Sequence, residues 1–247
     1  MPTSNQPRRT LLLTGASRGI GHATVKRFSA AGWRVITCSR HPFPENCPWE
    51  AGPEDHIQVD LADPANTEEA IAETKRRLHG ELHALVNNAA ISPKADGGKR
   101  LGSIETSRGD WHYIFQVNFF APIMLARGLL DELQNAKGSV VNVTSIAGSR
   151  VHPFAGVASA TSKAALAALT REMAADFGPL GVRVNAIAPG EIDTAMLSAG
   201  RTRLVVFRAC IISASTGAQK CDPPSNVSRI AAGPQAAGRG IRHVGRR

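Results

Sequence analysis

A glycine-rich turn follows the first apolar run of the chain and precedes a helical pattern. The turn consists of Gly15, Ala16, Ser17, Arg18, Gly19, Ile20 and Gly21. Glycine lets a backbone bend sharply and approach a pyrophosphate, whose negative charge the N-terminus of a helix stabilises. The glycines could serve only a tight turn, but their position between a strand and a helix favours a dinucleotide-binding site.

The residues after the second apolar run indicate which dinucleotide binds. An acid there would bind the ribose 2′-hydroxyl of NAD, whereas a base would accept the 2′-phosphate of NADP. The chain has Arg40 directly after Ser39, and Arg18 in the glycine turn supplies a second guanidinium. Two guanidiniums near one phosphate form charge-assisted hydrogen bonds. The pattern predicts NADP(H) rather than NAD(H), unless both arginines are only solvated surface residues.

A serine and a lysine four residues apart, Ser159 and Lys163, fall on one face of a predicted helix. Such a pair could act as nucleophile and base in hydrolysis. No oxyanion-hole signature accompanies the pair, so we disfavour this interpretation.

Alternating strand and helix patterns position these residues. The strand patterns are residues 10–14, 33–39, 57–60, 84–87, 139–144 and 182–187. Helical patterns begin near Ile20, after the N-cap and first-turn proline Asp63-Pro64, and at 158–177. This alternation predicts an α/β fold with a doubly wound parallel sheet of Rossmann type, in three layers and one domain over residues 1–200.

The composition is that of a globular protein, with 43% hydrophobic and 20% charged residues. No apolar run approaches the roughly 18 residues of a membrane span, and no signal-peptide core follows the N-terminus. We therefore expect a cytoplasmic protein that does not bind a membrane. The four cysteines lack the close pairing of metal or redox sites, so we expect reduced thiols and no metal.

Several ordered motifs resemble the short-chain dehydrogenase/reductase family, in its single-domain classical branch. They are the T-G-x-x-x-G-x-G turn, the N-N-A-A run at 87–90, Ser145, Lys163 and Pro189-Gly190. The resemblance covers residues 10 to about 200 and is closest to bacterial 3-oxoacyl-[acyl-carrier-protein]-reductase-like proteins and general carbonyl reductases. It implies an oxidoreductase that interconverts a small-molecule ketone and a secondary alcohol with NADP(H).

The resemblance also assigns further cofactor contacts. Asp60 and Leu61 would border the adenine and Asn88 the ribose, although Asp60 could instead be a strand-end cap. The nicotinamide side would be lined by Pro189, Gly190, Ile192 and Thr194.

The catalytic set of the family is matched at three of its four positions. By resemblance, Asn118 anchors a proton-relay water, Ser145 binds the substrate oxygen, and Lys163 holds the ribose and lowers the pKa of a tyrosine. That tyrosine, the proton donor, is replaced by Ser159, and the single tyrosine of the chain, Tyr113, does not fit the motif. Loss of a general acid typically costs on the order of 10² to 10⁴ in rate. We expect impaired carbonyl reduction unless water replaces the phenol, or a dinucleotide-binding protein without turnover.

Residues 201–247 depart from the family pattern. They carry eight arginines, one lysine and one aspartate, so eight of the nine net positive charges of the chain lie there. We expect a poorly ordered tail, a sheet without the usual last strand, and loss of the homo-oligomer interface that the family builds there. Translation out of frame or a solvated extension would each give such an ending. The tail lacks interleaved aromatic residues, so we expect no nucleic-acid binding.

Overall fold

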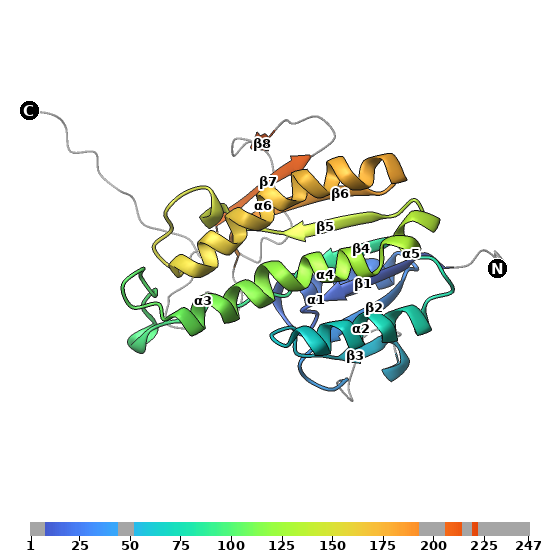
Figure 1. Cartoon of the computed structure of the whole chain (residues 1–247), viewed down its shortest axis with the longest axis horizontal. Coiled ribbons are helices and arrows are strands. Elements are labelled where there is room, and N and C mark those ends of the chain that lie inside the picture. Colours follow the sequence, from blue (N-terminus) through green and yellow to red (C-terminus); the bar gives the residue numbers. More distant parts are fainter. Residues whose placement is uncertain (1–7, 44–51, 193–205, 214–218, 222–247) are drawn as a thin grey trace, which may run out of the picture.

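A computed structural model describes residues 8–43, 52–192, 206–213 and 219–221, and it confirms the predicted α/β sheet (Figure 1). The strand order is β3-β2-β1-β4-β5-β6-β7-β8, with the first six strands parallel. Those six are β1 (Thr10–Thr14), β2 (Arg34–Ser39), β3 (His56–Gln58), β4 (Ala84–Asn87), β5 (Ser139–Val143) and β6 (Arg183–Glu191). Each overlaps a run that the sequence predicted as a strand.

Helices connect the parallel strands. They are α1 (Gly19–Ala30), α2 (Pro64–Arg77), α3 (Arg108–Phe115), α4 (Ala121–Gly128), α5 (Leu130–Asn135) and α6 (Val157–Phe177). A π-helical segment, η3 (Gln116–Phe120), joins α3 to α4, and short 3-10 turns are η1 (Pro53–Asp55), η2 (Asp96–Gly98), η4 (Ile146–Gly148) and η5 (Gly178–Leu180). The predicted cap of α2 is confirmed, because Asp63 Oδ1 accepts a hydrogen bond from Ala65 N at 2.8 Å. No helix in the described ranges is long and apolar enough to cross a membrane.

The alternation of side chains along β1 builds a core on each face of the sheet. Leu11 and Leu13 pack in one cluster with Val25 of α1. Leu12 packs in the other cluster with Leu125 of α4 and residues of α6. Figure 1 shows α2, α4 and α6 across one face of the sheet. Full burial of an aliphatic side chain contributes about 1.5–3 kcal/mol, so β1 anchors all three layers.

The strand order places a topological switch point beside β1. The chain passes from β1 outward to β2 and β3, and then returns to β4 on the other side of β1. At such a point the loops after the two neighbouring strands diverge and leave a crevice at their carboxyl ends. The glycine turn follows β1, and Asn88 follows β4. The fold therefore brings these two motifs to one crevice.

The tail differs in part from its prediction. β7 (Val206–Ser213) pairs antiparallel with β6, and β8 (Gln219–Cys221) pairs antiparallel with β7. We expected no ordered strand after residue 200. Apolar and β-branched residues in 206–213 favour a strand, a local signal that the surrounding arginine, glycine and proline obscured. The strand beside β6 is antiparallel, and the rest of the tail lies outside the described residues.

Candidate active site

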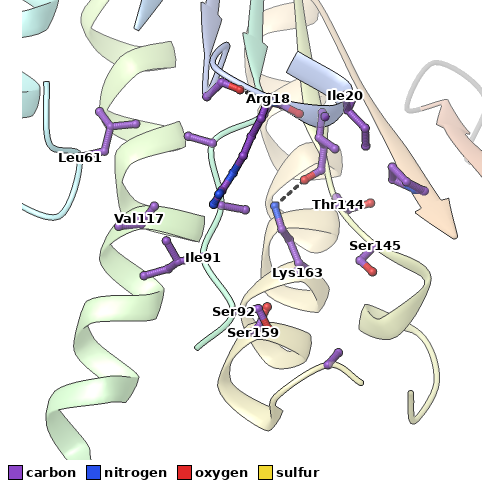
Figure 2. Close-up of a pocket in the computed structure, with 18 of the residues that line it drawn as sticks. Arg18, Ile20, Leu61, Ile91, Ser92, Val117, Thr144, Ser145, Ser159 and Lys163 are labelled. Carbon is purple, nitrogen blue, oxygen red and sulfur yellow. Dashed lines mark hydrogen bonds between the residues drawn. The ribbon is translucent and has the colours of Figure 1, made fainter. Parts of the chain in front are cut away.

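A cleft of about 550 Å³ lies at the carboxyl ends of the parallel strands, and it gathers most of the predicted site residues (Figure 2). Those that line it are Gly15, Ser17, Arg18, Gly19, Ile20, Arg40, Asp60, Leu61, Asn88, Ser145, Ser159, Lys163, Pro189, Gly190 and Ile192. Gly21 and Asn118 are buried behind its wall. Thr194 lies outside the described residues.

The glycine turn has a backbone conformation that residues other than glycine rarely adopt. Gly15 and Gly19 have φ angles of +68° and +58°, in the left-handed region that favours glycine. A Cβ on Gly15 would lie 2.8 Å from Ala89 Cα, and a Cβ on Gly21 would lie 2.1 Å from the Gly15 carbonyl oxygen. The glycines therefore allow β1, α1 and the segment after β4 to approach closely.

A set of hydrogen bonds fixes the turn to the segment after β4. Asn88 Nδ2 donates to the carbonyl oxygens of Thr14 at 3.0 Å and Gly15 at 2.9 Å. In return, Thr14 Oγ1 accepts from the backbone amides of Asn88 at 3.1 Å and Ala89 at 3.0 Å. Asn88 thus positions the glycine turn, a contribution that the sequence did not predict.

Replacing Gly21 by alanine tests this close approach. We expect Gly21→Ala to lower the free energy of unfolding by about 1–3 kcal/mol, as overpacking does, because the new methyl group would overlap backbone. Gly178→Ala is the matched control, since nothing lies within 4 Å of the position of its Cβ. Urea unfolding measures both variants. Equal stability of Gly21→Ala and the parent chain would contradict the tight turn.

Two arginines stand at one end of the cleft. Arg18 precedes α1 and Arg40 follows β2, and both are exposed. Neither forms an ion pair with another described residue. The arginines are available to bind an anion.

Asp60 also lines the cleft. Its Oδ1 accepts a hydrogen bond from Ala62 N at 3.0 Å, so this carboxylate makes the strand-end cap that the sequence left open.

Lys163 lies in the wall of the cleft, where its amine is buried. Lys163 Nζ donates to the Val143 carbonyl oxygen at 2.5 Å, the bond drawn in Figure 2. Burial disfavours the charged amine and lowers the pKa of Lys163 from 10.5 to about 8. Ser145, after β5, faces the same cleft, and its Oγ accepts from Ala147 N at 3.1 Å. The two side chains come from different elements and meet at one site.

Ser159 occupies α6 one turn before Lys163 and is buried in the cleft wall. Its carbonyl oxygen accepts from Ser162 Oγ at 2.8 Å. Tyr113, the single tyrosine of the chain, also lines the cleft, from α3. Tyr113 does not fit the family motif, yet the fold brings it to the same cleft.

Asn118 connects three segments behind the cleft. Its Oδ1 accepts from Ile91 N at 2.8 Å, and its Nδ2 donates to the Ile91 carbonyl oxygen and Ser162 Oγ, both at 3.0 Å. The residue is fully buried and belongs to the π-helical segment η3. Such segments are frequent at functional sites. Asn118 therefore ties η3 to α6 and to the segment after β4.

Ser92, Lys94 and His152 are among the polar residues of the cleft wall that the sequence did not predict. Ser92 and Lys94 continue from the N-N-A-A run beyond β4. Because ligands bind outside the carboxyl ends of parallel strands, that continuation could have been included. His152 belongs to the loop between β5 and α6, where no motif marks it.

Comparison with known proteins shows which family the chain resembles. A family model described as short chain dehydrogenase matches residues 9–204. The chain belongs to the short-chain dehydrogenase/reductase family. This membership confirms the resemblance drawn from the glycine turn and the later motifs, and with it an oxidoreductase by family.

Two members of this family are especially similar to the chain. Protein FixR of Bradyrhizobium diazoefficiens is 58% identical over 224 residues, which cover 90% of this chain and 78% of FixR. A solved oxidoreductase of the short-chain family from Brucella ovis, in complex with a partially ordered NAD, is 76% identical with a TM-score of 0.74, covering 76% of this chain and 85% of that one. The FixR alignment leaves out about a tenth of the chain, which is less than residues 201–247, so it extends into the tail.

A more distant neighbour carries the phosphorylated coenzyme. ElxO with NADP bound is 28% identical, with a TM-score of 0.67, and covers 77% of each chain. Solved relatives of this short-chain dehydrogenase therefore bind either dinucleotide.

Proposed function

We propose that this short-chain dehydrogenase is an NADP(H)-dependent oxidoreductase that interconverts a ketone and a secondary alcohol, with turnover impaired at Ser159. The observation that carries the proposal is the content of a single cleft. It holds a glycine turn with two free guanidiniums and, farther along, Ser145 and Lys163. The glycine turn and the guanidiniums suit a dinucleotide, and Ser145 and Lys163 suit the reaction of a carbonyl compound beside it.

The cleft is suited to a nicotinamide dinucleotide. The glycine turn and the N-terminus of α1 would hold the pyrophosphate. Asp60 and Leu61 would border the adenine, and Lys163 would bind the ribose. The segment Pro189, Gly190 and Ile192 would lie along the nicotinamide. When bound, this group supplies or accepts the hydride, while the chain orients it.

The preference for NADP(H) rests on charge. Because the solved relatives bind NAD or NADP, they do not decide the coenzyme. Arg18 and Arg40 would pair with the 2′-phosphate, and the residue directly after β2 is Arg40 rather than an acid that would bind a free 2′-hydroxyl.

Removing one guanidinium tests the preference. We expect Arg40→Gln to weaken NADPH binding by about tenfold or more, because a charge-assisted hydrogen bond is lost, and to leave NADH binding unchanged. Fluorescence titration of each dinucleotide measures both. Arg171→Gln, an exposed arginine on α6 away from the cleft, is the control. Equal weakening of NADH and NADPH would contradict a role for Arg40 at the 2′-phosphate.

The residues of the cleft divide the work on the substrate. Ser145 Oγ would hydrogen-bond the carbonyl oxygen and thereby stabilise charge that develops on it. Asn118 holds the segment after β4 in place. The alcohol of Ser159 is a much weaker acid than a phenol, so the proton for the substrate oxygen would have to come from water. This missing donor is the reason for the expected slow turnover.

A second candidate function is a dinucleotide-binding protein without turnover. The replacement of the proton donor by Ser159 favours it, while the cofactor end of the cleft keeps its glycines and arginines. Reduction of a 3-oxoacyl group, the cytoplasmic location and the state of oligomerisation remain predictions.

A further inference from the structure

The proposed dinucleotide site uses only part of the cleft, and the other end has no function assigned so far. The segment after β4 runs from Asn88, bonded to the glycine turn, past Ile91, bonded to Asn118, to Lys94. In Figure 2, Ser92 and Ser159 lie beyond Lys163 as seen from Arg18. This segment therefore leads from the cofactor end of the cleft to the end where a substrate would lie.

Lys94 is held in a defined position at that end. Its Nζ donates to the carbonyl oxygen of Phe154, in the loop before α6. Backbone bonds reinforce the junction: Val157 N donates to the Leu101 carbonyl oxygen at 3.0 Å, and Ala95 N donates to the Lys99 carbonyl oxygen at 2.9 Å. The ammonium of Lys94 keeps two further hydrogens for other acceptors.

The electrostatics of this end favour a negative charge. Lys94 and His152 both line it, and among the described lining residues the only acid is Asp60, which lies at the adenine end. Lys94 is half-buried, and the loss of water lowers the pKa of its amine. A bound anion would offset that cost. The lysine is thus a cation without a carboxylate near it in the described part of the cleft.

The hydroxyl of Ser92, at the same end of the cleft, has no hydrogen-bond partner among the described residues. Ser92 Oγ is buried and accepts or donates no hydrogen bond to another described atom. A buried hydroxyl without a partner destabilises the protein, so a ligand that bonds to Ser92 gains affinity. Ser92 lies two residues before Lys94 on the same segment of the cleft wall.

We infer that Lys94 and Ser92 bind an anionic group of the substrate, so that the substrate is a small carbonyl compound carrying a carboxylate or a phosphate. The inference rests on the proposed function, since the carbonyl must lie at Ser145 and the hydride must come from the dinucleotide. Lys94 sets substrate specificity in this account and takes no part in the transfer of hydride or proton.

Binding can be measured without turnover. The chain is first saturated with NADPH, and dissociation constants are then determined by calorimetry for levulinate, its neutral methyl ester and dihydroxyacetone phosphate. We expect levulinate or the phosphate to bind about tenfold or more tightly than the ester, as a hydrogen bond to a charged group allows. Tighter binding of the phosphate identifies the anion as a phosphate, and tighter binding of levulinate identifies it as a carboxylate.

Three variants assign the effect to Lys94. Lys94→Gln keeps a donor for the Phe154 carbonyl oxygen but removes the charge, and it should lose the preference for the anion while it still binds NADPH. Lys94→Arg should retain the preference. Lys99→Gln, exposed on the same loop and outside the cleft wall, should behave as the parent chain.

Three results would overturn the inference. They are equal affinities for levulinate, the phosphate and the ester, no binding of any of them by the NADPH complex, or an unchanged preference in Lys94→Gln. The last two leave the dinucleotide function standing. Failure to bind NADPH, in contrast, would remove the proposed function and this inference together.

Discussion

Ser159→Tyr is expected to raise kcat for NADPH-linked ketone reduction by about 10² to 10⁴, the usual contribution of a general acid. Ser159 lies in the cleft wall one helical turn before Lys163, and residues four apart share a helix face. A phenol has a pKa of about 10, and a neighbouring ammonium lowers it toward neutrality. The substitution would place such a donor beside Ser145.

The matched control for this variant is Ser159→Phe. It adds the same ring to the cleft without the hydroxyl, so it should give no gain in rate. Steady-state oxidation of NADPH with a panel of small ketones and oxo acids measures both variants. No gain in Ser159→Tyr, when NADPH binding is retained, would favour the dinucleotide-binding protein without turnover.

Lys163→Met is expected to stabilise the chain by about 2 kcal/mol at pH 7. Burial lowers the pKa of Lys163 from 10.5 to about 8, and a change of that size corresponds to about 3 kcal/mol. Loss of the hydrogen bond to the Val143 carbonyl oxygen offsets about 1 kcal/mol. The methionine fills a similar volume without the cost of burying an amine that must lose its proton or its water.

The pH dependence gives the sign of this effect. Between pH 8 and 10.5 the unfolded chain holds the lysine proton more tightly than the folded chain. The free energy of unfolding of the parent chain should therefore rise as the pH increases through this window. The advantage of Lys163→Met should disappear by about pH 10.5.

The difference in the free energy of unfolding between Lys163→Met and the parent chain is free of the titrations that both proteins share. Burial raises the pKa of the Cys38 thiol from 9.0 to about 12, which lowers stability as the pH rises above 9.0. Cys38 is present in both proteins, so it cancels in the difference. Urea unfolding at pH 7, 9 and 10 measures that difference. A constant difference across this range would contradict a lowered pKa for Lys163.

The sequence predicted the parallel sheet well because its signals are local. Short apolar runs alternate with helical patterns, and the caps and glycines that bound them act within a few residues. The strand Val206–Ser213, which pairs with β6, was missed although its apolar and β-branched residues favour a strand. Arginine and glycine near that segment dominated the local pattern.

The candidate site was predictable where a motif carried it. The glycine turn, Ser145 and Lys163 stand at fixed spacings, and the fold brings them to one cleft. Lys94 and His152 belong to no motif. They reach the cleft from the loops after two different strands, so only the fold brings them together. The bonds of Asn88 to the glycine turn likewise depend on the closeness of β1 and β4, which only the strand order reveals.

Thermal unfolding of the unmodified chain with NADPH, with NADH and with neither tests the central proposal most directly. A ligand at about 100 times its dissociation constant adds about 2.7 kcal/mol to the free energy of unfolding. We predict stabilisation of this size by NADPH at a concentration at which NADH has little effect. Stabilisation by neither dinucleotide would contradict a binding site at the glycine turn, and stabilisation by NADH alone would contradict the role of Arg18 and Arg40.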